Sequence, residues 1–96
     1  MNFESLDRYL LTGSPVKAEI VTSLLAMQDP PDQARPFLEG LRVLGSRTPD
    51  LALIALRLAL AGKPHGDGQV THLRSLVERA RGGDATAKEA YAAELA

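Results

Sequence analysis

The side chains best suited to chemistry in this sequence are two histidines, His65 and His72. Histidine can act as a general acid or base, or bind a metal ion, but both roles require further titratable or ligating groups in the same site. His65 lies in the segment GKPHGDG, His72 lies beside the apolar stripe of a predicted helix, and Asp67 is the one further ligand nearby. We therefore expect two solvated histidines, with no metal and no cofactor.

Nucleophile and phosphate-binding motifs are also missing. No serine stands in the Gly-x-Ser-x-Gly pattern that exposes a catalytic nucleophile at a strand-to-helix turn. The segment AGKP at residues 61–64 lacks the glycine spacing and the following Ser or Thr of a phosphate-binding loop. We therefore expect no catalytic residues and predict that the protein is not an enzyme.

Basic side chains gather on a segment predicted to be helical, residues 68–81. They are His72, Arg74, Arg79 and Arg81. Such a cluster would suit a DNA-contacting helix, but Glu78 interrupts it and stands one helical turn after Arg74, where the two can form an ion pair. The net charge of −1 gives no general attraction to nucleic acids or anionic membranes. A small helical DNA-binding regulator is therefore kept only as an alternative function.

Composition indicates a folded, all-helical protein. Apolar residues make up 45% of the chain and charged residues 24%, which is ordinary for a globular domain, and leucine and alanine dominate over aromatic and β-branched residues. The sequence contains no cysteine, and its beginning, MNFESLDRYLL, is not a secretory signal. The apolar run at residues 51–61 is about half as long as a membrane span. We therefore expect a cytoplasmic protein that does not contact membranes.

Helical periodicity and capping residues divide residues 1–96 into six helices of a single domain. The predicted helices span about residues 2–11, 15–28, 32–44, 49–61, 68–81 and 85–95. The predicted N-terminal caps are Asn2, Ser14, Thr48, Asp67 and Asp84. Proline follows two of these caps, at the first position of a helix, where its missing N–H is not needed.

An internal repeat relates the second predicted helix to the fourth. Shifting the chain by 34 positions aligns Pro15 with Pro49 and Ile20 with Ile54, and this shift equals the length of a tetratricopeptide repeat. We therefore predict an all-α, tetratricopeptide-like array of helical hairpins. Helices two and three form one hairpin, helices four and five form the next, and helices one and six cap the array.

The fourth predicted helix, in the segment TPDLALIALRLALAG at residues 48–62, is apolar on almost every side. One face can serve the core, and it consists of Leu51, Ile54, Ala55 and Leu58. The second face consists of Leu53, Leu56, Arg57 and Leu60. The corresponding positions of the second helix are mostly small or polar, so the repeat does not require this second face to be apolar.

Several interpretations of the second face stay open. In the first, the helix is central and is packed by predicted helices three, five and six together. In the second, the face is a groove that receives an amphipathic partner helix and is flanked by Thr22, Ala26 and Tyr91. Arg57 then pairs with a carboxylate of the partner, or extends from a packed stem to water. A homodimer in which this helix pairs with its own copy is a third alternative.

The second half of the chain resembles a known family. The stretch at residues 48–96 looks like the C-terminal half of the tetratricopeptide-like needle chaperones of bacterial type III secretion, and residues 38–63 are similar to tetratricopeptide-like proteins of plant-pathogen type III systems. The residues that carry the resemblance are Pro49, Leu51, Ala55, Leu56, Leu58, Leu60, Gly62, Leu73, Leu76, Asp84 and Leu95. It implies a helix-binding chaperone that sequesters a needle subunit in the cytoplasm. Its groove would hold the subunit's amphipathic C-terminal helix, often beside a small helical co-chaperone.

Overall fold

The computed structural model describes residues 3–14 and 16–96 and is all-α, with no strand among these residues. Its helices are α1 (Glu4–Thr12), α2 (Lys17–Leu25), α3 (Arg35–Leu44), α4 (Asp50–Leu60), α5 (Asp67–Arg81) and α6 (Ala85–Leu95). Two short 3-10 turns, Asp32–Ala34 and Gly45–Arg47, precede and follow α3. The predicted all-α fold with about six helices is confirmed.

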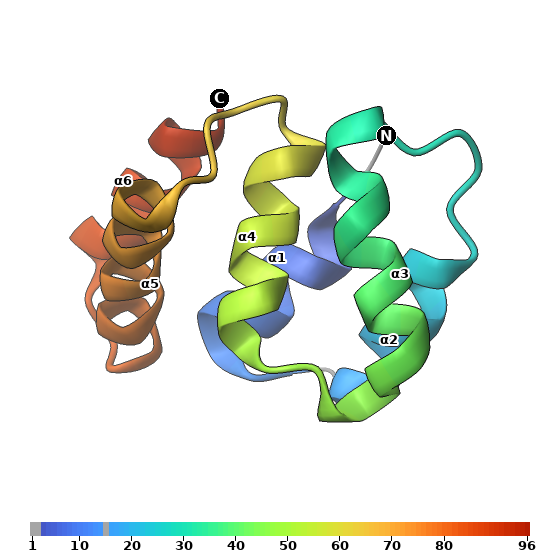
Figure 1. Ribbon diagram of the computed structural model, residues 1–96. Coiled ribbons are helices and arrows are strands. Elements are labelled where there is room, and N and C mark those ends of the chain that lie inside the picture. Colours follow the sequence, from blue (N-terminus) through green and yellow to red (C-terminus); the bar gives the residue numbers. More distant parts are fainter. Residues whose placement is uncertain (1–2, 15) are drawn as a thin grey trace.

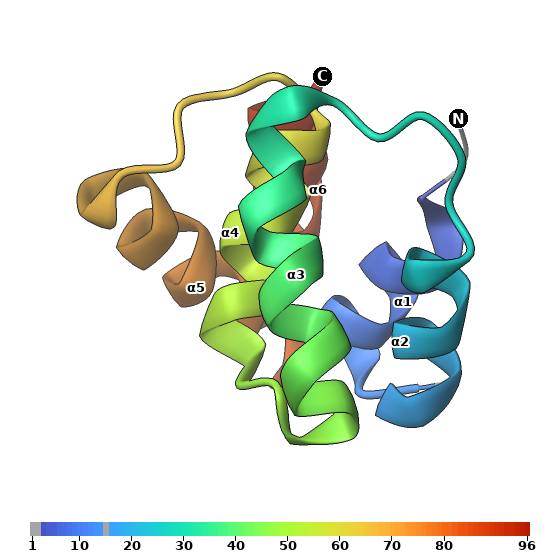
Figure 2. The same ribbon diagram turned by 45° about the vertical axis from the view of Figure 1, so that its right-hand side comes forward.

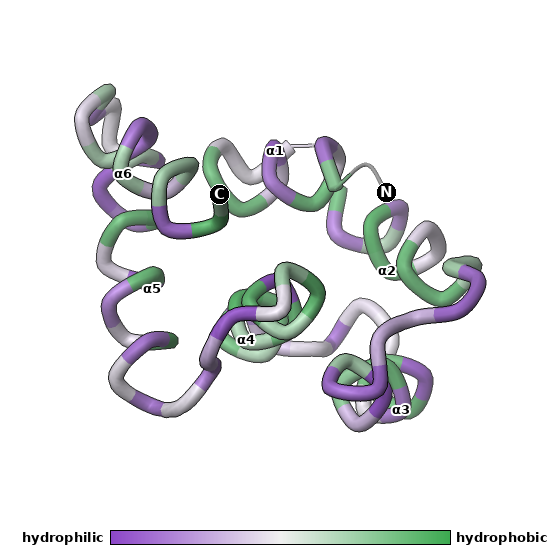
Figure 3. The backbone as a smooth tube through the Cα atoms, turned by 90° about the horizontal axis from the view of Figure 1, so that it is seen from above, coloured by the Kyte–Doolittle hydropathy of each residue, from purple (hydrophilic) through white to green (hydrophobic). Residues whose placement is uncertain are grey.

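Helix α4 lies in the middle of the molecule. Figure 1 shows α5 and α6 on one side of it and α2 and α3 on the other. Figures 1 and 2 show that α3 and α4 lie side by side and run in opposite directions. Seen from above, α3 and α5 flank α4, with α1 and α2 across from it (Figure 3). This arrangement follows from the composition of α4, because a helix that is apolar on every side is stable only where neighbours cover all of it.

The burial of α4 confirms the interpretation of a central helix. Every residue from position 53 to position 60 is buried, including Arg57. The helices that cover it differ from the expectation, because α1 packs on α4 beside α3 and α5, while α6 packs mainly on α5. The assignment of Leu51 to the core was wrong, since 44% of its surface is exposed at the first turn of α4.

Helix α1 was expected to cap one end of an array, but it does not. It packs on α2, which follows it in sequence, and also on α4 and α5. The two predicted hairpins, α2 with α3 and α4 with α5, do pack as neighbours. Because α1 reaches α5, the chain closes around α4, and the order of helices in sequence is not their order in space.

One predicted cap is confirmed in full. The Asp84 carboxylate accepts hydrogen bonds from the main-chain N–H groups of Thr86, at 2.9 Å, and Ala87, at 3.2 Å, which satisfies two free donors of the first turn of α6. These backbone bonds, led by that of Ala87, together with the guanidinium of Arg79 hold the pKa of Asp84 below its usual value. At the other end of the chain, Gly13 ends α1 in a left-handed conformation with φ of 80°, which glycine adopts without strain.

Two other predicted caps were wrong, because α4 begins one residue later than expected and α5 begins one residue earlier. Thr48 and Pro49 are both extended, so α4 begins at Asp50 and its free N–H groups lie beyond the Thr48 hydroxyl. Residues that precede proline are forced into this extended region. Thr48 is instead buried, and its Oγ1 has no hydrogen-bond partner. Likewise Asp67 is the first residue of α5, and the cap position is occupied by Gly66.

Helix α2 is shorter than predicted at both ends. It begins at Lys17 after an extended Val16, so Ser14 is too early to cap it, and its last residue is Leu25. The early start at Pro15 and the cap at Asn2 lie outside the described residues. Within the described ranges, no helix is long and apolar enough to cross a membrane.

Candidate functional site

The predicted binding face of α4 is covered within the chain. Leu53, Leu56 and Leu60 are 0%, 1% and 7% exposed, so the face is not an open groove and that expectation was wrong for this conformation. Helix α4 is covered by α3, by α5, by the turn Asp32–Ala34 and by α1, which reaches it at Arg57. Contact between these leucines and a partner stays a prediction.

Arg57 is paired inside the chain, so neither interpretation of this residue was right. Its Nε donates to Oδ1 of Asp7 at 2.7 Å and its Nη2 donates to Oδ2 at 3.3 Å, which is the two-pronged geometry that favours arginine over lysine. The guanidinium also lies 4.6 Å from the centre of the Phe3 ring. The carboxylate that the sequence suggested from a partner therefore comes from α1 of the same chain.

Tyr91 of α6 binds the same carboxylate. It is 2% exposed, and its hydroxyl donates a hydrogen bond to Oδ1 of Asp7. Burial, and then the neighbouring Asp7, raise the pKa of Tyr91 far above its ordinary 10.0, so the phenol keeps its proton and remains a donor. Two of the predicted partner-binding residues, Arg57 and Tyr91, thus meet at a single carboxylate of α1.

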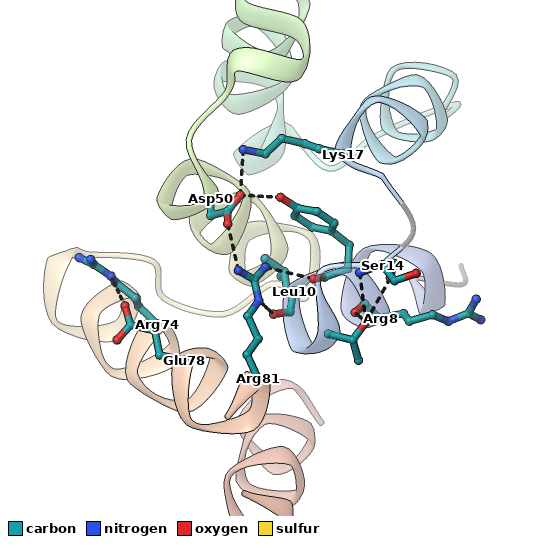
Figure 4. Close-up of polar contacts among 10 residues, drawn as sticks. Arg8, Leu10, Ser14, Lys17, Asp50, Arg74, Glu78 and Arg81 are labelled. Carbon is teal, nitrogen blue, oxygen red and sulfur yellow. Dashed lines mark hydrogen bonds and ion pairs between the residues drawn. The ribbon is translucent and has the colours of Figure 1, made fainter. Parts of the chain in front are cut away.

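A second carboxylate joins α4 to three other helices. Asp50 accepts from Nζ of Lys17 at 2.9 Å, from the hydroxyl of Tyr9 at 2.9 Å and from Nη1 of Arg81 at 3.3 Å, and Figure 4 shows Lys17 and Arg81 converging on it. Burial opposes the ionisation of Asp50, but these bonds outweigh it and hold its pKa below the usual value. Burial and the bond to Asp50 raise the pKa of Tyr9.

Arg81 also ties α5 to the end of α1. Its Nε donates to the main-chain oxygen of Leu10 at 2.6 Å and its Nη2 to that of Tyr9 at 3.1 Å (Figure 4). The last carbonyl groups of a helix carry partial negative charge, which favours a guanidinium at this end. The oxygen of Tyr9 also accepts from the main-chain N–H of Gly13 at 2.7 Å. Arg81, which was counted in the candidate DNA-binding cluster, is therefore engaged in the fold.

Three other charged residues of α5, Arg74, Glu78 and Arg79, are paired as well. Arg74 donates to Glu78 at 3.0 Å, which confirms the predicted ion pair, and Arg79 donates to Asp84 at 3.1 Å. His72 lies 3.1 Å from a carboxylate oxygen of Glu94, and both side chains are about half exposed. In the part of the chain that the structure describes, no three His, Cys, Asp or Glu side chains gather closely enough to hold a metal ion.

An open apolar cavity lies between α1 and α2, and we name it the α1–α2 cleft. Its volume is about 400 Å³. It is lined by Phe3, Ser5, Leu6, Ile20, Ser23, Leu24, Ala26, Met27 and Gln28. No charged side chain is among them, and the polar groups are two hydroxyls and one amide. The α1–α2 cleft is therefore suited to uncharged, apolar groups.

Of the seven predicted binding residues, Ala26 alone lines the α1–α2 cleft. Thr22 is exposed on α2, and its hydroxyl donates to the main-chain oxygen of Ala18 in the same helix. The lining residues that sequence reasoning missed include Phe3 and Met27, which are only partly buried although apolar. Phe3 stands at helical spacing from Leu6 and Leu10, a pattern that predicts core packing and gives no sign of a cavity. Met27 stands beyond the end of α2.

A second cavity, of about 450 Å³, lies on the other side of α2, against α3. It shares Leu24 and Met27 with the α1–α2 cleft. Unlike the cleft, it includes charged side chains, namely Arg35, Glu39 and Arg42. The end of α2 thus separates an uncharged hollow from a charged one.

No protein-family model matches the chain, and no curated protein and no solved structure is significantly similar to it.

Proposed function

We propose that the protein is a helix-binding adaptor or chaperone rather than an enzyme, and that its partner is held in the α1–α2 cleft. The observation that carries the proposal is the lining of this cleft, which is open and apolar and contains no charged residue. Concave sites lined mainly by apolar side chains with a few polar groups are typical of binding sites. The partner that fits it presents apolar side chains and no charge at the point of contact.

The shape of the α1–α2 cleft favours side chains of a helix over a small molecule. The cleft is lined along two helices, α1 and α2, and Met27 at its end also lines the separate, charged hollow against α3. An amphipathic helix places residues at positions i, i+3 and i+4 in such a row. Met27 suits this role, since its unbranched side chain adapts to different occupants.

The partner class is taken from the resemblance of residues 38–96. On this proposal the protein holds a needle-type subunit of a type III secretion system in the cytoplasm, by the subunit's amphipathic C-terminal helix. The cysteine-free composition fits that compartment. The residues that line the α1–α2 cleft precede position 38 and so lie outside the stretch that carries the resemblance. Capture of a needle-type subunit is therefore tested separately from binding in the cleft.

We do not propose DNA binding. The arginines of α5 are neutralised by Glu78, Asp84 and Asp50, which leaves little free positive charge for phosphate contacts.

The experiment places a charge in the α1–α2 cleft without disturbing the core. Ala26→Glu and Ser23→Glu alter exposed residues that line it, and Thr22→Glu alters an exposed residue of the same helix outside it. Binding is measured by fluorescence anisotropy with a labelled amphipathic model helix of leucine, glutamate and lysine, and by co-purification of a needle-type subunit. We expect each cleft variant to weaken binding about tenfold, which is about 1.4 kcal/mol, while Thr22→Glu leaves it unchanged.

Equal affinity for wild type and both cleft variants would show that the α1–α2 cleft is not the site. Binding of the model helix without capture of a needle-type subunit would keep the adaptor function and remove the proposed client. Circular dichroism of every variant checks that the helices are intact.

A further inference from the structure

We propose that the helix held in the α1–α2 cleft carries acidic side chains beside its apolar row, and that Arg35 and Arg42 select them. This inference rests on the proposed function and adds to it the charge of the partner. The selecting site is the second cavity, which lies against α3 and which we name the α2–α3 hollow. It is lined by Leu24, Leu25, Met27, Pro30, Arg35, Leu38, Glu39 and Arg42.

The two cavities lie on either side of one short stretch of chain. Helix α2 packs on both α1 and α3 (Figure 3), and Leu24 and Met27 line both the α1–α2 cleft and the α2–α3 hollow. An α-helix with its side chains is about 10–12 Å across. A partner helix laid over Met27 therefore presents its apolar row to the cleft and the side chains beside that row to the hollow.

The lining of the α2–α3 hollow is more basic than acidic, since it contains two arginines and one glutamate. Arg42 donates to Glu39 through Nη1 at 3.3 Å, and Arg35 donates through Nε at 3.0 Å to Asp32, which does not line the hollow. Each of these pairs uses one nitrogen of a guanidinium, which has five N–H donors. Donors therefore remain on both arginines for the carboxylates of a partner.

The existing ion pairs do not hold the two arginines firmly. The side chains of Arg35 and Arg42 are both 60% exposed, and those of Asp32 and Glu39 are 96% and 69% exposed. Ion pairs exposed to this degree contribute little, because water and salt screen them. A partner helix over the hollow displaces water from the arginines, so new pairs with its carboxylates are screened less than the old ones.

The net charge of the chain makes an acidic preference diagnostic of the hollow. The whole chain carries a charge of −1, so long-range attraction favours a basic partner slightly. The α1–α2 cleft has no charged residue and gives no preference of either sign. A preference for acidic side chains therefore has to come from arginines beside the cleft, which is why we commit to an acidic amphipathic helix as the occupant.

The test uses three helical peptides that share one row of leucines. The positions on both sides of the row are filled with glutamate in the first peptide, glutamine in the second and lysine in the third, so the direction in which a peptide lies does not matter. Binding is measured by fluorescence anisotropy at low and at high salt. We expect the glutamate peptide to bind about fivefold more tightly than the glutamine peptide, and the lysine peptide to bind most weakly, with differences that shrink at high salt.

Arg42→Glu reverses one charge of the α2–α3 hollow, and Arg74→Glu is its matched control. Arg74 pairs with Glu78 on exposed α5 as Arg42 pairs with Glu39 on α3, and Arg74 lines neither cavity. Both variants therefore lose one exposed ion pair and change the net charge equally. We expect Arg42→Glu to lose the preference for the glutamate peptide, while Arg74→Glu keeps the order of affinities of wild type. Circular dichroism checks that both variants and all three peptides are helical.

The glutamine peptide separates this inference from the proposed function, because it has an apolar row and no charged side chain. Equal affinity of wild type for all three peptides would overturn the inference and leave the α1–α2 cleft as the binding site. The same order of affinities in Arg42→Glu as in wild type would also overturn it. Failure of all three peptides to bind would overturn the inference and the proposed function together.

Discussion

Arg81, at the end of α5, donates a hydrogen bond from Nε to the main-chain oxygen of Leu10 at 2.6 Å. It thereby caps the C-terminal end of α1, although the two residues are 71 positions apart in sequence. The same guanidinium reaches the oxygen of Tyr9 and the carboxylate of Asp50. We expect Arg81→Ala to lower the free energy of unfolding by about 2 kcal/mol, because hydrogen bonds that involve a charged group contribute about 1.5–3 kcal/mol. Urea unfolding followed by circular dichroism measures the change.

The matched control for this prediction is Arg74→Ala. Arg74 pairs with Glu78 on the exposed surface of the same helix, and such pairs contribute about 0–1 kcal/mol. Equal stability losses for the two variants would show that Arg81 acts as an ordinary surface arginine.

Removing the hydroxyl of Thr48 should stabilise the protein. Its Oγ1 is buried and has no hydrogen-bond partner, so the folded state bears the cost of desolvating it. Thr48→Val keeps the shape and removes this cost, and we expect the free energy of unfolding to rise by about 1 kcal/mol. Thr22→Val on exposed α2 should change it by less than about 0.5 kcal/mol. Thermal unfolding of wild type, Thr48→Val and Thr22→Val tests this prediction. A destabilised Thr48→Val would mean that the Thr48 hydroxyl has a hydrogen-bond partner in solution.

Two leucines of α4 should respond differently to truncation. Leu53 is 0% exposed, so Leu53→Ala leaves a cavity and should cost about 2–5 kcal/mol. Leu51 is 44% exposed at the start of the same helix, so Leu51→Ala should cost less than about 1 kcal/mol. Both values come from urea unfolding. A small effect at Leu53 would show that its side of α4 is open in solution, as the groove interpretation required.

The free energy of unfolding should fall at acidic pH because of Asp50. Its pKa in the folded chain lies below the ordinary 3.8, so the folded state binds fewer protons than the unfolded state in this range. The stabilisation is complete well above pH 3.8 and is lost as the pH falls through the lower folded value. Urea unfolding as a function of pH should therefore show a steeper acid loss for wild type than for Asp50→Asn. Parallel curves would mean that Asp50 titrates normally.

The helices could be predicted from sequence because their signals are local. The apolar period and the cap at Asp84 each depend on neighbouring residues, and both were confirmed. The error at Thr48 has a local cause too, since an extended Pro49 moved the start of α4 by one residue beyond reach of the hydroxyl. The burial of residues 53–60 of α4 followed from one of three interpretations, because hydrophobicity alone does not say whether a neighbour or a partner covers a face.

The candidate site was harder to predict because its contacts join distant parts of the chain. No local pattern relates Asp7 to Arg57 or to Tyr91, and without that knowledge Arg57 looked free for a partner. The α1–α2 cleft depends on how two helices diverge, which the spacing within either helix does not determine. Ala26 entered the predicted site through its position in the repeat, and Phe3 and Met27 had no such position.

The contact between Asp7 and Tyr91 sets an order of events during synthesis. A ribosome makes the chain from the N-terminus, so α1 emerges before the residues of α5 and α6 that hold it. Until then Leu6 and Leu10 have no covered surface to occupy, and α4 is without one of its neighbours. Closure of this fold is therefore a late step that waits until α5 and α6 have left the ribosome.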